Sequence, residues 1–224
     1  MTALAPQAVT AVSRPFAMDA HRFNELWCRS GGGIEADEVF EALATRYQEP
    51  HRHYHTGAHV QSCLDTYDWA ESVLGRSDAV EMALWFHDVV FCIGRSDNEA
   101  QSAEFFRVFA GGHLPGVFIN KVTALIMATC HRELPAEPDS RFVADVDLAE
   151  LARPWRDFMV AYRSLCAESV DSADADRLKR QQAFFKRLLG WPSIFGTTLF
   201  QSRYERVARE NIQRLLFSAD LSST

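Results

Sequence analysis

The chain has 224 residues, of which 47% are hydrophobic and 24% are charged, the balance of an ordinary globular domain rather than of a disordered or fibrous chain. The formal net charge is −7, and Lys and Arg form no run, which argues against a broad contact with a nucleic-acid polymer. No window approaches the roughly 18 continuous apolar residues of a membrane span, so membrane insertion is excluded.

Residues 1–18 have neither the basic start nor the continuous apolar stretch of a secretory signal peptide. We therefore expect a cytoplasmic protein with a flexible N-terminal tail at 1–18, one domain at 19–218 and a C-terminal tail at 219–224. The cysteines are odd in number and form no CxxC pair, so we expect buried, reduced thiols. They are Cys28, Cys63, Cys92, Cys130 and Cys166.

Apolar residues recur with the helical period throughout the chain, and the alternating pattern of strands is missing. In chain order, the first helix is predicted over residues 20–29, where the glycines at 31–33 end it. The second is predicted over residues 36–46. Pro50 disfavours helical geometry at the residue before it, so residues 49–54 form a loop. The predicted fold class is all-α.

The next two helices are predicted to lie at the centre of a helical bundle. One begins at Thr56 as its N-cap, ends at Gly75 and turns an apolar face toward the core. The other begins at Ser77 and is apolar nearly all round over residues 80–91, as expected of a helix in the middle of a bundle. The remaining helices are predicted over residues 98–110, 115–130, 140–151, 154–170, 174–189 and 201–217.

His87 and Asp88 interrupt this most apolar helix. Burying an imidazole beside a carboxylate is costly unless something compensates for both groups. A divalent metal ion would do so, and the alternative for the pair taken alone is a buried His-Asp hydrogen bond. His59 upstream and Asp147 downstream favour the metal, because the set then offers two imidazoles and two carboxylates.

The order of His59, His87-Asp88 and Asp147 resembles the H…HD…D signature of the HD-domain metal-dependent phosphohydrolases. The chain also resembles one branch, the predicted metal-dependent HD phosphohydrolases, over about residues 20 to 217. The segments that carry this likeness are residues 49–55, residues 83–90, Asp97-Asn98-Glu99 with Ser102-Ala103, Ala128-Thr129 with His131, residues 142–148, and Tyr204-Glu205 to Ala208-Arg209 with Asn211. The chain departs from the branch at Ser169, where an aromatic residue is frequent, and at Cys130, where a second histidine is common.

The resemblance implies a single helical bundle with the metal site between central helices, and the hydrolysis of phosphoesters. Two imidazoles and two carboxylates suit one divalent ion of Mn, Fe, Co, Ni, Zn or, less well, Mg. An octahedral ion held by four protein ligands would keep positions for a water and a phosphate oxygen, which predicts hydrolysis by metal-activated water. Some HD proteins bind two metals through extra histidines, and His131 could serve a second ion here.

Candidates for a general base and a phosphate contact lie near these ligands in the sequence. Glu99 and Asp97 could orient the attacking water or serve the leaving group; the alternative is an N-terminal capping cluster. Arg52 could present a bidentate donor to a phosphate; its alternative is an ion pair that fixes the loop. His55 and His131 are predicted to line the substrate site.

Asp145 leaves the last ligand open, because it lies two residues before Asp147 and could replace it or support an imidazole from behind. The first functional hypothesis is a hydrolase of a small phosphomonoester or nucleotide, with homo-oligomer formation left open. One alternative is a metal-stabilised module that binds a nucleotide without cleaving it. Another is a di-iron oxygenase on the same scaffold.

Overall fold

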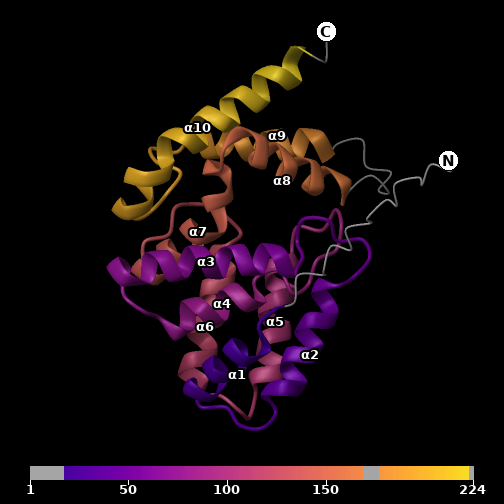
Figure 1. The fold of residues 1–224 in the computed structure, drawn as a ribbon, viewed down its shortest axis with the longest axis vertical. Coiled ribbons are helices and arrows are strands. Elements are labelled where there is room, and N and C mark those ends of the chain that lie inside the picture. The colour runs from indigo at the N-terminus through magenta and orange to yellow at the C-terminus, as the bar shows by residue number, and fades with distance from the viewer. Residues whose placement is uncertain (1–17, 169–176, 222–224) are drawn as a thin grey trace, which may run out of the picture.

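The computed structural model describes residues 18–168 and 177–221, which form helices and no strand, so the all-α prediction is confirmed (Figure 1). The elements are α1 Ala20–Arg29, α2 Ala36–Tyr47, α3 Gly57–Leu74, α4 Asp78–Phe86, α5 Asn98–Ala110, α6 Gly116–Ala128, α7 Pro138–Leu148, the short 3₁₀ helix η1 Ala149–Ala152, α8 Trp155–Ala167, α9 Arg177–Gly190 and α10 Thr198–Leu221.

The predicted helices match this order and differ mainly at their ends. Residues 1–17 of the N-terminal tail predicted at 1–18, residues 169–176 and residues 222–224 lie outside the described residues, together with the predicted helix ends that fall there. Helix α10 is longer than predicted, since it begins at Thr198 and continues to Leu221.

The prediction that His87 and Asp88 lie within a helix was wrong. Helix α4 ends at Phe86, and the two residues lie on the turn that follows it. The physical reason is that the carbonyls needed for the next turn have other donors: the Trp85 carbonyl accepts from the Tyr47 hydroxyl at 3.0 Å, and the Leu84 carbonyl accepts from Nδ1 of His87 at 3.0 Å. Arg52 then holds the turn through the carbonyls of Asp88 and Val89, at 2.7 and 2.8 Å.

Local capping chemistry explains why several helices begin and end as they do. Asp19, Thr56 and Ser77 precede α1, α3 and α4, and each side chain accepts a hydrogen bond from a backbone N–H of the first turn. Gly75 ends α3 with φ at 90°, a backbone conformation that favours glycine. The entry of α3, which carries His59, is therefore fixed by its own cap.

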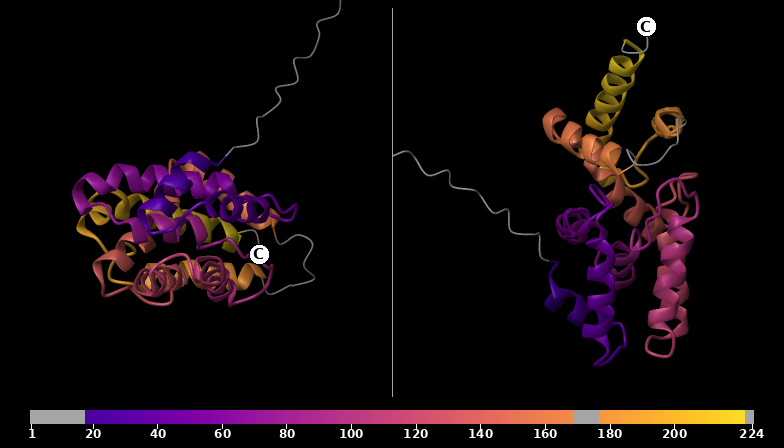
Figure 2. Two further views of the ribbon diagram at one scale, coloured as in Figure 1. Left: turned by 90° about the horizontal axis from the view of Figure 1, so that it is seen from below. Right: turned by 90° about the vertical axis from the view of Figure 1, so that its right-hand side faces the viewer.

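Helix α4 is the central element, since it contacts α1, α3, α5, α6 and α7. In the right-hand view of Figure 2, α1 and α2 lie on one side of it and the paired helices α5 and α6 lie on the other. Trp85 and Phe86 of α4 are fully buried and pack against Phe23 of α1, with ring centroids 5.4 and 6.1 Å apart. This core holds the end of α4, and with it His87, in one place.

Helices α8, α9 and α10 form the upper end of the molecule in Figure 1. Asn211 of α10 joins this end to η1 and the residues after it, since it donates to the carbonyls of Leu151 and Arg153 at 2.9 and 2.8 Å. Within this end, Arg209 of α10 donates to the carbonyl of Trp191, just after α9, at 2.8 Å. Among residues 18–168 and 177–221, no helix combines the length and apolar character that crossing a membrane requires.

Candidate metal centre

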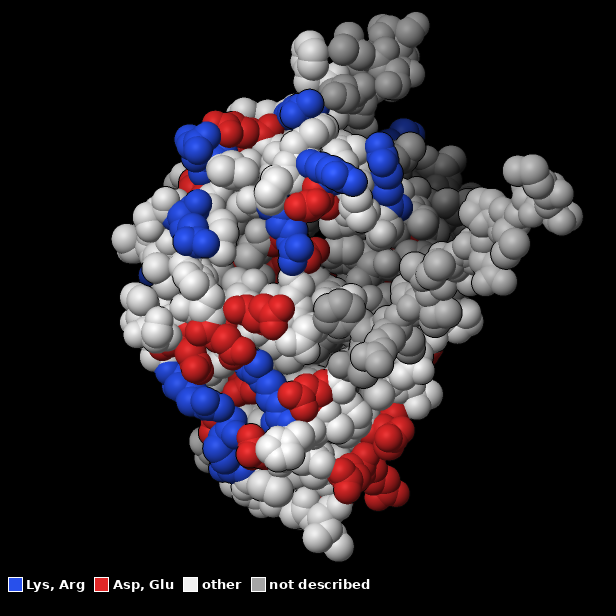
Figure 3. Space-filling view, in the orientation of Figure 1, with Lys and Arg blue, Asp and Glu red and all other residues white. Residues whose placement is uncertain are grey.

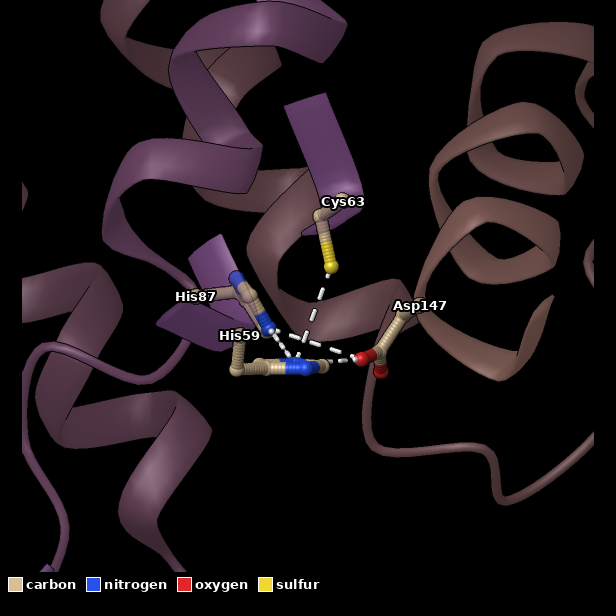
Figure 4. A group of neighbouring side chains, drawn as sticks. All are labelled: His59, Cys63, His87 and Asp147. Carbon is tan, nitrogen blue, oxygen red and sulfur yellow. Dashed lines mark hydrogen bonds and ion pairs between the residues drawn. The ribbon is translucent and has the colours of Figure 1, made fainter. Parts of the chain in front are cut away.

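Four side chains from three helical elements converge in the interior and could hold a metal ion. His59 and Cys63 lie one turn apart on α3, His87 follows the end of α4, and Asp147 comes from α7 (Figure 4). One ligand atom from each lies within 4.8 Å of all the others. Nε2 of His59 is 3.2 Å from Nε2 of His87 and 3.2 Å from Oδ1 of Asp147.

Asp88, the remaining predicted ligand, lies at the edge of this cluster. Its Oδ2 is 3.0 Å from Nε2 of His87 and 3.6 Å from Nε2 of His59. The structure therefore brings together all the residues that the sequence predicted as ligands, and it adds Cys63. The carboxylates are partly open, each with 15% of its side chain exposed, whereas the imidazoles are buried.

The hydrogen bond of His87 favours its use as a ligand. Its Nδ1 lies 3.0 Å from the carbonyl oxygen of Leu84. Since a carbonyl can only accept, Nδ1 carries the proton, and in the neutral ring the lone pair of Nε2 then faces the cluster. Metal-binding imidazoles are commonly oriented in this way.

The electrostatic environment also fits a cation. Burial by itself lowers the pKa of an imidazole, but Cys63 and Asp147 hold the pKa of His59 well above its ordinary value. Asp88 and Asp147 do the same for the pKa of His87. The surroundings of both rings therefore stabilise positive charge at this position.

The carboxyl groups show the matching effect. Despite burial, His87 keeps the pKa of Asp88 below its ordinary value, and His131 keeps the pKa of Asp147 well below its own. Ionised carboxylates beside two buried imidazoles stabilise positive charge between them. Protons on the imidazoles or a bound divalent cation can supply that charge. The residues present therefore fit a metal ion.

Arg52 lies behind the turn that carries His87 and Asp88, and its side chain is fully buried. Its Nη1 donates to the carbonyls of His55 and Asp88 at 2.9 and 2.7 Å, and its Nε donates to Glu49 at 3.0 Å. Arg52 therefore fixes the loop through an ion pair with Glu49, which is the alternative to a phosphate contact. The phosphate contact predicted for Arg52 does not fit it, because the guanidinium has no exposed surface to offer a ligand.

The segment after Asp88 is held by α5 as well. The hydroxyl of Ser102 accepts from the N–H of Val90 at 3.0 Å, and the side-chain amide of Asn98 bonds both the N–H and the carbonyl of Cys92 at 3.0 and 3.1 Å. These two residues of the motif at 97–103 thus serve to position the turn.

Glu168, at the end of α8, fixes the loop that leads into α3. Its Oε1 accepts hydrogen bonds from the backbone N–H groups of His53, Tyr54 and His55 at 2.8 to 2.9 Å. Its Oε2 lies 2.7 Å from Nδ1 of His55. This contact turns Nε2 of His55 toward Asp88, and Nε2 lies 3.9 Å from Oδ2 of Asp88.

Replacing Glu168 by alanine should loosen this loop, because three partly buried backbone N–H groups would lose their charged acceptor. Each such loss costs about 1 to 3 kcal/mol, so the amides of residues 53–55 should exchange with solvent about 5- to 100-fold faster. Hydrogen exchange followed by mass spectrometry measures this directly. Asp157→Ala, at an exposed position on the same helix, should leave exchange in the loop unchanged; equal rates in the two variants would contradict the assigned role.

His131 lies directly on Asp147, with Nε2 2.7 Å from Oδ2. It is buried, and its φ of 48° makes it a non-glycine residue in the left-handed region. Such a conformation is retained only where the surroundings impose it. The contact orients Asp147 so that its other oxygen faces His59 and His87. Substrate binding by His131 and a second ion beside it stay predictions.

Asp145 does not belong to the cluster. Its carboxylate accepts hydrogen bonds from the N–H groups of Gly196 and Thr197 at 2.6 and 2.8 Å, and from the Thr197 hydroxyl at 2.6 Å. Burial raises the pKa of Asp145 to about 6. Asp145 therefore fixes the turn before α10, and the ambiguity left by the sequence resolves in favour of Asp147.

A cavity of about 310 Å³ opens onto the cluster, with Asp88, Asp147, His55 and His131 in its wall. Glu99 also lines it, and its role as a base stays a prediction. The structure does not bring Asp97 to this cavity: its carboxylate is paired with Arg95 at 2.7 and 2.6 Å outside it.

Cys63 and Glu168 were not predicted as residues of the site. The spacing of four between His59 and Cys63 was a usable signal, since side chains four apart lie on one face of a helix. No local signal could have found Glu168, because the loop that it holds lies 113 to 115 residues away along the chain.

Comparisons of this chain with protein-family models, with curated proteins and with solved structures find no match.

Proposed function

We propose that the protein is a metal-dependent phosphohydrolase that acts on a small phosphomonoester or nucleotide, and that it belongs to the HD-domain superfamily. One observation carries the proposal: His59, His87, Asp88 and Asp147 converge, and the two aspartates of this cluster line a cavity of about 310 Å³. This is the order and identity of ligands that the resemblance implies.

A divalent ion bound there supplies a Lewis acid for a phosphoryl oxygen and lowers the pKa of water. Nε2 of His59, Nε2 of His87 and the carboxylates of Asp88 and Asp147 would hold it. Glu99, on the cavity wall, takes the proton of the attacking water.

Since Arg52 is buried, a different positive side chain has to contact the phosphate. A second cavity, of about 250 Å³, shares His55 and Phe184 with the first and is lined by Arg180 of α9. We assign the phosphate contact to Arg180, because a guanidinium matches the geometry of phosphate oxygens. His55 borders both cavities and contacts the substrate between them.

Size and charge favour a small substrate. On the face shown in Figure 3, basic and acidic side chains alternate, and the Lys and Arg residues form no continuous surface of the kind that follows a nucleic-acid backbone. The cavity is of the size that accommodates a small molecule.

The test is turnover by purified protein loaded separately with Mn, Co, Ni, Zn or Mg, on a panel of phosphomonoesters and nucleotides. Glu99→Gln should lower kcat about 100-fold or more without changing metal content. Glu104→Gln, at an exposed position of the same helix, should match the unsubstituted protein. Absence of turnover with every metal, together with an intact nucleotide in the mass spectrum of the native protein, would show a binding module instead.

A further inference from the structure

We propose that Cys63 binds the metal ion as a thiolate, and that this makes the centre select Zn, Co or Ni over Mg and Mn. The inference rests on the metal site of the proposed function and goes beyond its ligands, which are all nitrogen and oxygen. It concerns a sulfur donor that the H…HD…D pattern does not contain, and that completes a set of four donors with His59, His87 and Asp147, with Asp88 as a further carboxylate at the edge of this set.

The position of the sulfur is the first argument. Cys63 follows His59 by one turn of α3, only 1% of it is exposed, and its sulfur points toward the other three groups in Figure 4. Its Sγ lies 3.7 Å from Nε2 of His59, and it is a free thiol. The core therefore holds a reduced sulfur against the cluster.

The distances between donors are the second argument. Nitrogen, oxygen and sulfur donors bound to one tetrahedral ion at about 2.0 to 2.3 Å lie about 3.3 to 3.7 Å from one another. Around His59 the distances are 3.2 Å to His87, 3.2 Å to Asp147 and 3.7 Å to Cys63, and His87 to Asp147 is 3.5 Å. The longest of these involves sulfur, as its longer bond to a metal requires.

The donor set also matches the chemistry of these metals. Two imidazoles, one thiolate and one carboxylate form a set that suits Zn, Co and Ni, whereas Mg and Mn prefer oxygen donors. On binding, the thiol of Cys63 gives its proton to solvent and the sulfur gives an electron pair to the ion, so metal uptake releases a proton from this residue. No oxidation or reduction is involved.

X-ray absorption at the zinc edge of the full-length zinc-loaded protein tests the proposal without a substitution. We expect one sulfur scatterer at about 2.3 Å beside nitrogen and oxygen at about 2.0 to 2.2 Å. A thiol that only bonds to His59 would give nitrogen and oxygen alone, which would overturn the proposal.

Substitutions identify which cysteine supplies the sulfur. With Co bound, a thiolate gives a charge-transfer band in the near ultraviolet, and Cys63→Ser should abolish it and weaken Zn binding about 10-fold or more. Cys130→Ser is the matched control, because Cys130 lies in the cavity wall and its replacement should keep the band. Loss of the band in Cys130→Ser alone would contradict the assignment.

The proposed function and this inference fail in different ways. A zinc–sulfur signal without turnover on any phosphate ester would retain the role of Cys63 and contradict hydrolysis. Turnover without a sulfur scatterer would retain hydrolysis and contradict the role of Cys63.

Discussion

Asp147→Asn should weaken metal binding by about 100-fold or more, with a comparable fall in kcat/KM, equivalent to about 2.7 kcal/mol. Asp147 is the carboxylate at the centre of the cluster: Oδ1 faces His59 and Oδ2 lies 2.7 Å from His131. An amide has the same shape but lacks the negative charge that offsets a divalent ion. Titration of the apoprotein with Co or Zn measures the affinity.

The matched control is Asp37→Asn, an exposed aspartate of α2 outside the cluster. It should bind metal as the unsubstituted protein does. Thermal unfolding of both variants separates loss of a ligand from loss of the fold. Full metal affinity in a folded Asp147→Asn protein would show that the carboxylate is not a ligand.

Arg52→Met should destabilise the protein by about 3 kcal/mol, because the buried carbonyl of residue 89 and the partly buried carbonyls of residues 55 and 88 lose their donor. For a domain of this size that corresponds to a fall in Tm of about 6 to 12 °C. Metal binding should weaken as well, since the turn that presents His87 and Asp88 loses its support. Calorimetry of the metal-free protein isolates the structural part.

Arg46→Met provides the comparison, because Arg46 pairs with the same Glu49 at 3.1 Å but from the surface, with 45% of its side chain exposed. Surface ion pairs contribute about 0 to 1 kcal/mol, so its Tm should barely change. Similar Tm values for the two variants would contradict a structural role for Arg52.

Much of the fold was predictable because the signals that set it are local. The caps at Thr56 and Ser77 and the glycine at 75 lie beside the elements that they begin or end, and the apolar character of α4 identified the central helix. The end of α4 was missed because its causes are distant: the Tyr47 hydroxyl takes the carbonyl of Trp85 from 38 residues away. Arg52 holds the carbonyls of residues 88 and 89 from 36 and 37 residues away.

The same contrast holds within the site. His59, His87, Asp88 and Asp147 could be predicted because residue type and order alone suggest a set of ligands. The roles of the polar residues around them could not be predicted. An arginine or glutamate has the same sequence signal whether its side chain contacts a ligand or bonds backbone groups of a loop. Arg52 and residues such as Glu168 and Asp145 bond loop backbone, which only the folded chain shows.

Anomalous diffraction from crystals of the protein grown with Co or Zn, measured at the absorption edge of the metal, tests the central claim most directly. The account predicts one strong peak between Nε2 of His59, Nε2 of His87 and Oδ1 of Asp147, about 2.0 to 2.2 Å from each. Crystals with metal bound only at surface residues, and with no peak at this position, would contradict it.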